Sequence, residues 1–357
     1  MNLDDMTKFT TLDKSNMLAE ITSLPDQLEK SWLDALQKTE QLAPFPELQS
    51  ILICGMGGSA IAGDLFIAYA QAACRVPIQV SRDYDLPAWV GPNHTLVIAS
   101  SHSGGTEETL STVVQARKAG ARVIGITTGG KLSEYLAAEK QEVLYFEHKG
   151  QPRSAVGYSF THLAAIFYRL GLIPNPAADI EKAVSAMRSQ LAYISPDVPV
   201  ANNPAKRLAG QLMGRAVMIF GENILAPIAR RWKGQINELA KAWAGYDTVP
   251  EACHNSIAGT QFPERPIGDT FALFLRSKLD HTRNFKRSEL FQNLMMVQGF
   301  MTDFLIVRGD SPIEVMWTGL SFGDFTAYYL AMSYEIDPTP IDAIQGFKKE
   351  LGEFQVF

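Results

Sequence analysis

Short apolar runs alternate with amphipathic stretches along this chain. The runs span about four to eight residues, are rich in Val and Ile, and are bounded by Gly, Pro or Asn, which is typical of strands buried on both faces of a sheet. They are SILICGMG (50–57), VPIQVSRDY (76–84), TLVIASS (95–101), ARVIGITT (121–128) and EVLYFEH (142–148). Stretches between them, such as TEETLSTVVQARKAG (106–120), have helical spacing and end on glycine. Strand alternating with helix predicts a doubly wound parallel sheet.

The same alternation resumes in the second half of the chain. Its apolar runs are RAVMIFGEN (215–223), TFALFLRS (270–277) and TDFLIVRGD (302–310), with helical stretches at 225–244 and 288–300. A length of 357 residues also exceeds what one core usually supports. We therefore expect an α/β protein with two doubly wound parallel-sheet domains. The expected division is a helical lead at 1–48, a first domain at 49–172, a linker at 173–209 and a second domain at 210–357.

Composition narrows the class of protein. The chain is 46% hydrophobic and 20% charged, as ordinary soluble globular proteins are. Its net charge is −6 and its basic residues are scattered, which argues against nucleic acid or an anionic membrane as a partner. Three cysteines without CxxC spacing indicate neither a disulfide framework nor a metal site. The polar, acidic N-terminal stretch and the lack of a long apolar run lead us to expect a cytoplasmic protein.

Two loops rich in glycine and hydroxyl groups follow the first and third predicted strands. GMGGSAIAGD (55–64) offers Gly57, Gly58 and Ser59, and SSHSGGTEET (100–109) offers Ser101, Ser103 and Thr106. Ligands of parallel sheets bind beyond the carboxyl ends of the strands, where helix N-termini attract anions. Neither loop has P-loop or GxGxxG spacing or contains lysine or arginine. We predict that they hold a phosphomonoester; the alternative is that the hydroxyls only cap helices.

A different cluster, KGQINELAKAWAGYDTVPEACHNSIAG, occupies residues 233–259. We expect its first part, through about Tyr246, to be a helix that carries Glu238. VPEACHN then places His254 on a loop. A carboxylate and an imidazole in one pocket are the minimum needed to move protons on a sugar. Considered singly, Glu238 on a helix is more often a solvated surface charge, and His254 is more often a capped loop or core histidine.

These motifs resemble known families. GGSAIAGD together with SxSGxTxET resembles the sugar isomerase (SIS) domain, which binds phosphosugars. NExAK followed by PExxHN resembles the bifunctional phosphoglucose/phosphomannose isomerase family. QPRSAVGY (151–158) and DPTPIDAIQGFKKEL (337–351) resemble further motifs of that family, in the same order along the chain.

The resemblance implies an aldose–ketose isomerase that converts glucose 6-phosphate, and also mannose 6-phosphate, to fructose 6-phosphate through a cis-enediol. It implies Glu238 as the base, Arg153 as the stabiliser of negative charge, His254 for ring opening and Lys348 as a helper. The phosphate would lie on Gly57, Gly58, Ser59, Ser101, Ser103 and Thr106. It further implies a homodimer in which His254 crosses to the neighbouring subunit, a C-terminal helix, and neither cofactor nor metal.

The chain departs from the family pattern at His102, Gly105, Leu239 and Ser256. None of these is a proton-transfer residue, so these departures affect the predicted substrate specificity more than the predicted class of reaction.

Two other functions fit parts of the sequence. A non-catalytic SIS regulator would explain the hydroxyl loops without requiring Glu238, Arg153 and His254. An amidotransferase-type ketose isomerase would use a Schiff-base lysine and usually carries an N-terminal cysteine, which this sequence does not show.

Overall fold

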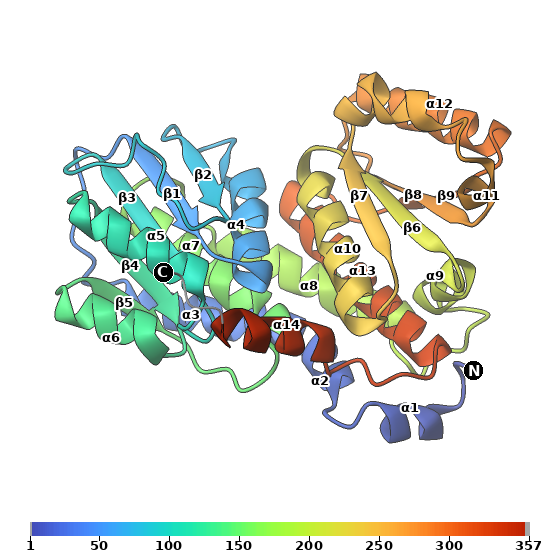
Figure 1. The fold of residues 1–357 in the computed structure, drawn as a ribbon, viewed down its shortest axis with the longest axis horizontal. Coiled ribbons are helices and arrows are strands. Elements are labelled where there is room, and N and C mark those ends of the chain that lie inside the picture. Colours follow the sequence, from blue (N-terminus) through green and yellow to red (C-terminus); the bar gives the residue numbers. More distant parts are fainter. Residues whose placement is uncertain (1, 354–357) are drawn as a thin grey trace.

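Two parallel sheets organise the chain in the computed structural model, which describes residues 2–353 (Figure 1). The first sheet has the order β2-β1-β3-β4-β5. Its strands are β1 (Ser50–Cys54), β2 (Ile78–Ser81), β3 (Thr95–Ser100), β4 (Arg122–Thr127) and β5 (Glu142–Tyr145). Each predicted apolar run of the first half thus contains a strand. The predicted α/β class with parallel sheets is confirmed.

The second sheet has four parallel strands in the order β7-β6-β8-β9. They are β6 (Ala216–Gly221), β7 (Ala244–Thr248), β8 (Thr270–Arg276) and β9 (Met301–Ile306). In both sheets the first strand along the chain lies between the second and the third, so the strand order reverses beside it. Loops at such a switch point diverge and leave room for a ligand.

Helices cover both faces of each sheet. Those before β6 are α1 (Met6–Leu12), α2 (Met17–Thr22), α3 (Leu24–Lys38), α4 (Gly57–Ala70), α5 (Glu107–Lys118), α6 (Gly130–Ala138), α7 (Val156–Arg169), α8 (Ala177–Ile194) and α9 (Pro204–Leu212). Those after it are α10 (Ala226–Leu239), α11 (Glu264–Gly268), α12 (Thr282–Val297), α13 (Pro312–Ser333) and α14 (Asp342–Glu353). Short 3-10 turns are η1 (Pro152–Ser154), η2 (Asn223–Leu225), η3 (Glu251–His254) and η4 (Ser256–Gly259).

One continuous hydrophobic core joins the two domains. Alternate residues of a strand face opposite sides, so Ile51 and Ile53 of β1 pack into this core while Leu52 packs under α5 and α6. The same core receives Ile219 of β6 in the second sheet. Helices α4, α7, α10 and α13 all contribute to it, which explains why the segments between the sheets are helical and buried.

Helix α13 is buried along almost its whole length and was missed by the sequence analysis, because a helix that is apolar all round has no amphipathic period. Helix α10 packs closely against it. The indole Nε1 of Trp232 donates a hydrogen bond to the Gly319 carbonyl oxygen (2.8 Å). One turn further along α13, a Cβ on Gly323 would lie 2.1 Å from Trp232 Nε1. Only glycine leaves room for this ring.

Two segments differ from the expected elements. The predicted helix over 225–244 was wrong at its end: α10 stops at Leu239, Lys241 adopts a φ of +51°, and β7 begins at Ala244. Residues 173–209, the expected linker, hold α8 and the first part of α9. The proposed domain limits therefore stay a prediction. Within residues 2–353, none of the helices combines the length and apolar character needed to cross a bilayer.

The Trp232–Gly323 packing gives a stability prediction. Gly323→Ala forces a methyl group into a closed contact, and we expect the free energy of unfolding to fall by about 1–3 kcal/mol. Urea denaturation followed by circular dichroism measures this. Gly346→Ala in α14 is the matched control, because a Cβ there meets nothing within 4 Å. Equal unfolding midpoints for the two variants would contradict the packing account.

Candidate active site

Glu238 lies near the C-terminal end of α10, on the side of the helix that faces away from the core. The opposite side buries Trp232, Ile236 and Leu239, three residues with helical spacing. The Glu238 side chain keeps 28% of its surface exposed. Asn237 then helps to end the helix, because its amide donates to the Ala242 carbonyl oxygen (2.7 Å). The carboxylate is thus presented to an open space rather than to the core.

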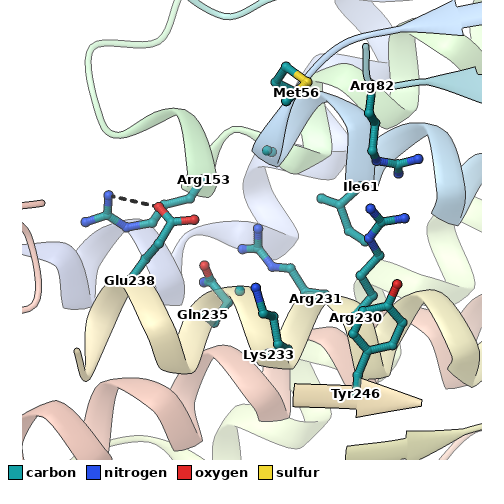
Figure 2. A pocket seen from close by; sticks show the side chains of 13 residues that line it. Met56, Ile61, Arg82, Arg153, Arg230, Arg231, Lys233, Gln235, Glu238 and Tyr246 are labelled. Carbon is teal, nitrogen blue, oxygen red and sulfur yellow. Dashed lines mark ion pairs between the residues drawn. The ribbon is translucent and has the colours of Figure 1, made fainter. Parts of the chain in front are cut away.

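Arg153 approaches Glu238 from the 3-10 turn η1, which follows the first sheet. Its side chain is only 3% exposed, and its Nη1 lies 3.7 Å from Glu238 Oε2 (Figure 2). Its Nη2 donates to the carbonyl oxygens of Pro338 (3.1 Å) and Thr339 (2.7 Å). Burial lowers the pKa of Arg153, and the Glu238 charge opposes that effect. Three segments far apart in sequence therefore meet at this guanidinium.

The first turn of α4 packs directly against the turn that carries Arg153. A Cβ on Gly58 would lie 2.6 Å from the Pro152 carbonyl oxygen, closer than real side chains come. Similarly, a Cβ on Gly55 would lie 2.7 Å from the Ser100 carbonyl oxygen at the end of β3. Gly55 and Gly58 of the GMGGS motif are therefore required for close backbone approach, whereas Gly57 adopts a φ of +49° and a Cβ there would meet nothing within 4 Å. The start of α4, the end of β3 and the Arg153 turn form one packed unit.

The hydroxyl groups of the two predicted loops lie at helix starts. Ser59 is buried in the first turn of α4, and Thr106 occupies the N-cap position of α5 without a side-chain capping hydrogen bond. The hydroxyls of Ser101 and Thr106 lie 2.9 Å apart and form a hydrogen bond. Ser103 is exposed and accepts a hydrogen bond from the Gly105 amide (3.3 Å). Both loops are thus at the carboxyl edge of the first sheet, as predicted.

His102, one of the departures from the family pattern, turns away from these hydroxyls. Its Nε2 lies 2.9 Å from Nδ1 of His148, and the other ring nitrogen of His148, Nε2, lies 3.3 Å from Oε2 of Glu20. Burial lowers the pKa of His102 to about 4, and the neighbouring His148 contributes to the lowering. His102 is therefore uncharged at neutral pH and contributes no positive charge to the loop.

A cavity of about 310 Å³ lies between α4 and α10. Such a volume is in the usual range for small-molecule sites. Of the predicted residues, Gly57, Gly58, Arg153 and Glu238 line it, whereas none of the four hydroxyl residues does. The other lining residues are Met56, Ile61, Arg82, Arg230, Arg231, Lys233, Gly234, Gln235 and Tyr246. The structure therefore joins the glycine motif to the predicted base and cation in one space.

Four of the cationic residues of this cavity were missed by the sequence analysis. Arg230, Arg231 and Lys233 come from α10, and the two arginines lie about two turns before Glu238. Arg82 follows β2 (Figure 2). Arg231 forms a buried bidentate pair with Asp324 of α13 (2.8 and 3.2 Å). The signal was available as RRWK at helical spacing from Glu238. No comparable signal marked Arg82, which only the fold brings to this space.

Lys241 also lies beside the site. Its Nζ donates to the carbonyl oxygens of Asp337 (2.9 Å) and Leu239 (3.2 Å). Burial lowers the pKa of Lys241 to about 8, and the charge of Arg153 lowers it as well. Lys241 and Arg153 thereby hold the same segment, residues 337–339, by its carbonyl groups.

The structure does not bring His254 or Lys348 to Glu238 within one chain. His254 is exposed at the end of η3, after β7, and does not line the cavity. Lys348 is exposed on α14, which crosses in front of the region between the two sheets (Figure 1). Their predicted roles stay predictions.

Comparisons with known proteins identify the family of this chain. Residues 201–351 match the family model of the bacterial phospho-glucose isomerase C-terminal SIS domain. A bifunctional phosphoglucose/phosphomannose isomerase of Caldicellulosiruptor bescii is 37% identical over 95% of this chain and 100% of its own length. The chain belongs to the bifunctional phosphoglucose/phosphomannose isomerase family. The predicted family, the SIS-type domains and the class of enzyme, an isomerase, are confirmed by this membership.

One further relative is similar in sequence, and two solved structures have a similar fold. The bifunctional phosphoglucose/phosphomannose isomerase of Thermoplasma acidophilum is 33% identical over 85% of this chain and 89% of its own length. A hypothetical protein from Thermus thermophilus has the same fold, with a TM-score of 0.71 at 16% identity, over 93% of this chain and 89% of that chain. A glucose-6-phosphate isomerase-like protein of the same organism has a TM-score of 0.64 at 16% identity, over 96% and 98% of the two chains.

Proposed function

We propose that this member of the family interconverts glucose 6-phosphate and mannose 6-phosphate with fructose 6-phosphate. The observation that carries the proposal is the buried guanidinium of Arg153, 3.7 Å from the Glu238 carboxylate, in a cavity walled by the first turn of α4. A carboxylate and a fixed cation, placed beside a helix start that favours anions, suit a phosphosugar that must lose a proton.

Proton transfer accounts for the chemistry without a redox step. Glu238 takes the proton from C2 of the open-chain aldose, the electrons of that C–H bond form the C1–C2 double bond, and the electrons of the C1=O double bond pass to O1 as a negative charge. The O2 proton moves to O1 within this cis-enediol intermediate, which shifts the charge to O2. Glu238 then returns its proton to C1, and O2 becomes the ketone oxygen at C2. Arg153 stabilises the negative charge that develops on the enediolate oxygens, because a fixed cation needs no reorganisation in a partly dry pocket.

The phosphate group anchors the sugar at the other end. In this proposal it lies on the hydroxyls of Ser59, Ser101, Ser103 and Thr106 and on the amides of Gly57 and Gly58. These groups are neutral, so they position the phosphate by hydrogen bonds rather than by ion pairs. Anchoring of this kind makes a weak base effective, because it holds C2 over the carboxylate. Mannose 6-phosphate requires proton delivery to the other face of C2 or rotation about C2–C3.

Ring opening needs a group that moves a proton between O5 and O1. We assign it to His254 of the partner subunit, since His254 is exposed and does not line its own chain's cavity. The functional unit is then a homodimer in which each site takes Glu238 from one subunit and the imidazole from the other. Lys348 is a candidate helper from α14.

Replacing the base tests the reaction. Glu238→Gln keeps the size of the side chain and removes its basicity, so we expect kcat on glucose 6-phosphate and on mannose 6-phosphate to fall by roughly 10²–10⁴-fold. The coupled assay is run with EDTA, which should leave the wild-type rate unchanged. Glu181→Gln, on the exposed side of α8, is the matched control. Full activity of Glu238→Gln would show that another group is the base. An inactive wild-type protein would favour the alternative function, a non-catalytic SIS regulator.

Subunit complementation tests the shared site. Glu238→Gln and His254→Ala are each expected to have low activity. When the two are mixed, dissociated and reassociated, half of the dimers combine both variants and each contains one intact site, so about one quarter of the wild-type activity should return. No recovery, with dimers present by sedimentation, would place both residues of a site in the same chain.

A further inference from the structure

The cavity has a positively charged end that the proposed reaction does not use. Two of its five cations are neutralised by their own carboxylates, Arg153 by Glu238 and Arg231 by Asp324. The remaining three are Arg82, Arg230 and Lys233. Figure 2 shows Arg82 and Arg230 pointing toward one another at the end of the cavity opposite Glu238, with Ile61 beside them.

Arg82 and Arg230 share one carboxylate, that of Asp64. The guanidinium groups of Arg82 and Arg230 both approach the same oxygen, Oδ2 of Asp64, at 2.5 and 3.2 Å. Asp64 comes from α4 and Arg230 from α10, so this contact also spans the two domains. Within residues 2–353, Lys233 makes no hydrogen bond or ion pair. Lys233 lies farther along the cavity, beside Gln235 (Figure 2), so the three cations share one carboxylate and leave two positive charges uncompensated.

Two uncompensated charges in a partly enclosed space attract a dianion. Guanidinium groups present forked N–H donors that match phosphate oxygens, and a lysine adds a mobile donor. Arg82 and Arg230 keep part of their surface accessible, at 24% and 36% of the side chain, so donors remain free for a ligand. Repulsion among the three cations falls when an anion enters, which favours its binding.

We propose that Arg82, Arg230 and Lys233 form a second anion subsite, which binds a phosphate group independently of the hydroxyl loops. The hydroxyl loops offer neutral donors, whereas this end of the cavity offers charges, so the two places differ in salt dependence as well as in position. A phosphate bound here also brings negative charge into the space that holds Glu238, and it therefore opposes formation of the enediolate.

Direct binding tests the proposal without relying on turnover. Inorganic phosphate is titrated into the full chain by calorimetry in chloride-free buffer. Among the phosphate ions bound, we expect one equivalent per chain to lose roughly tenfold in affinity in Lys233→Gln and more in Arg230→Gln, because each variant loses a charged contact. Lys30→Gln on the exposed side of α3 is the matched control and should bind as the wild type does. Ser101→Ala/Ser103→Ala should retain this equivalent.

The results separate the proposal from its competitors. If all phosphate binding disappears in Ser101→Ala/Ser103→Ala and none changes in Lys233→Gln, the subsite does not exist, whereas the proposed reaction is untouched. If Lys233→Gln leaves phosphate affinity unchanged but alters the sedimentation of the protein, the three cations pair with a second copy of the chain, and the proposal is also wrong.

Titration with sorbitol 6-phosphate identifies the source of the anion. If a second equivalent of sorbitol 6-phosphate binds, and its affinity falls in Lys233→Gln, the subsite accepts phosphate groups in general. If no second equivalent binds, the subsite is specific for the free phosphate ion.

Discussion

The close approach of Gly58 to the Pro152 carbonyl is the contact on which the geometry of the site depends. It joins the start of α4, which bears the glycine and hydroxyl motif, to the turn that carries Arg153. Any side chain at position 58 would separate the two segments. Because Arg153 also holds residues 338 and 339, this one contact connects the proposed phosphate-binding edge of the first sheet to the chain after α13.

Glu238 is placed by a second, independent set of contacts. Helix α10 is fixed against α13 by the Trp232 ring over Gly323 and by the buried Arg231–Asp324 pair. Removing one partner of such a buried pair would leave an uncompensated buried charge, which is strongly destabilising. Since one core runs through both domains, the carboxylate from the second domain and the guanidinium from the first keep a defined separation. The proposed chemistry needs that separation to be constant.

Sequence patterns located the strands other than β7, and the glycine motif, because local periodicity and turn chemistry determine them. The same patterns did not predict features that depend on tertiary packing. Helix α10 ends at Leu239 although the sequence continues in a helical pattern. Strand β7 (AGYDT) lacks the apolar run by which the other strands were predicted. Arg82 joins the cavity only through the strand order of the first sheet. The position of His254 relative to a site depends on the assembly, which one chain does not specify.

Gly58→Ala tests the central claim most directly. The account predicts that α4 and the Arg153 turn move apart, and a misplacement of about 1 Å at a catalytic group costs roughly a hundredfold in rate. Turnover of glucose 6-phosphate should therefore fall by at least tenfold, while Gly210→Ala in α9, where a Cβ meets nothing within 4 Å, keeps the wild-type rate. A folded Gly58→Ala protein with undiminished turnover would contradict the account.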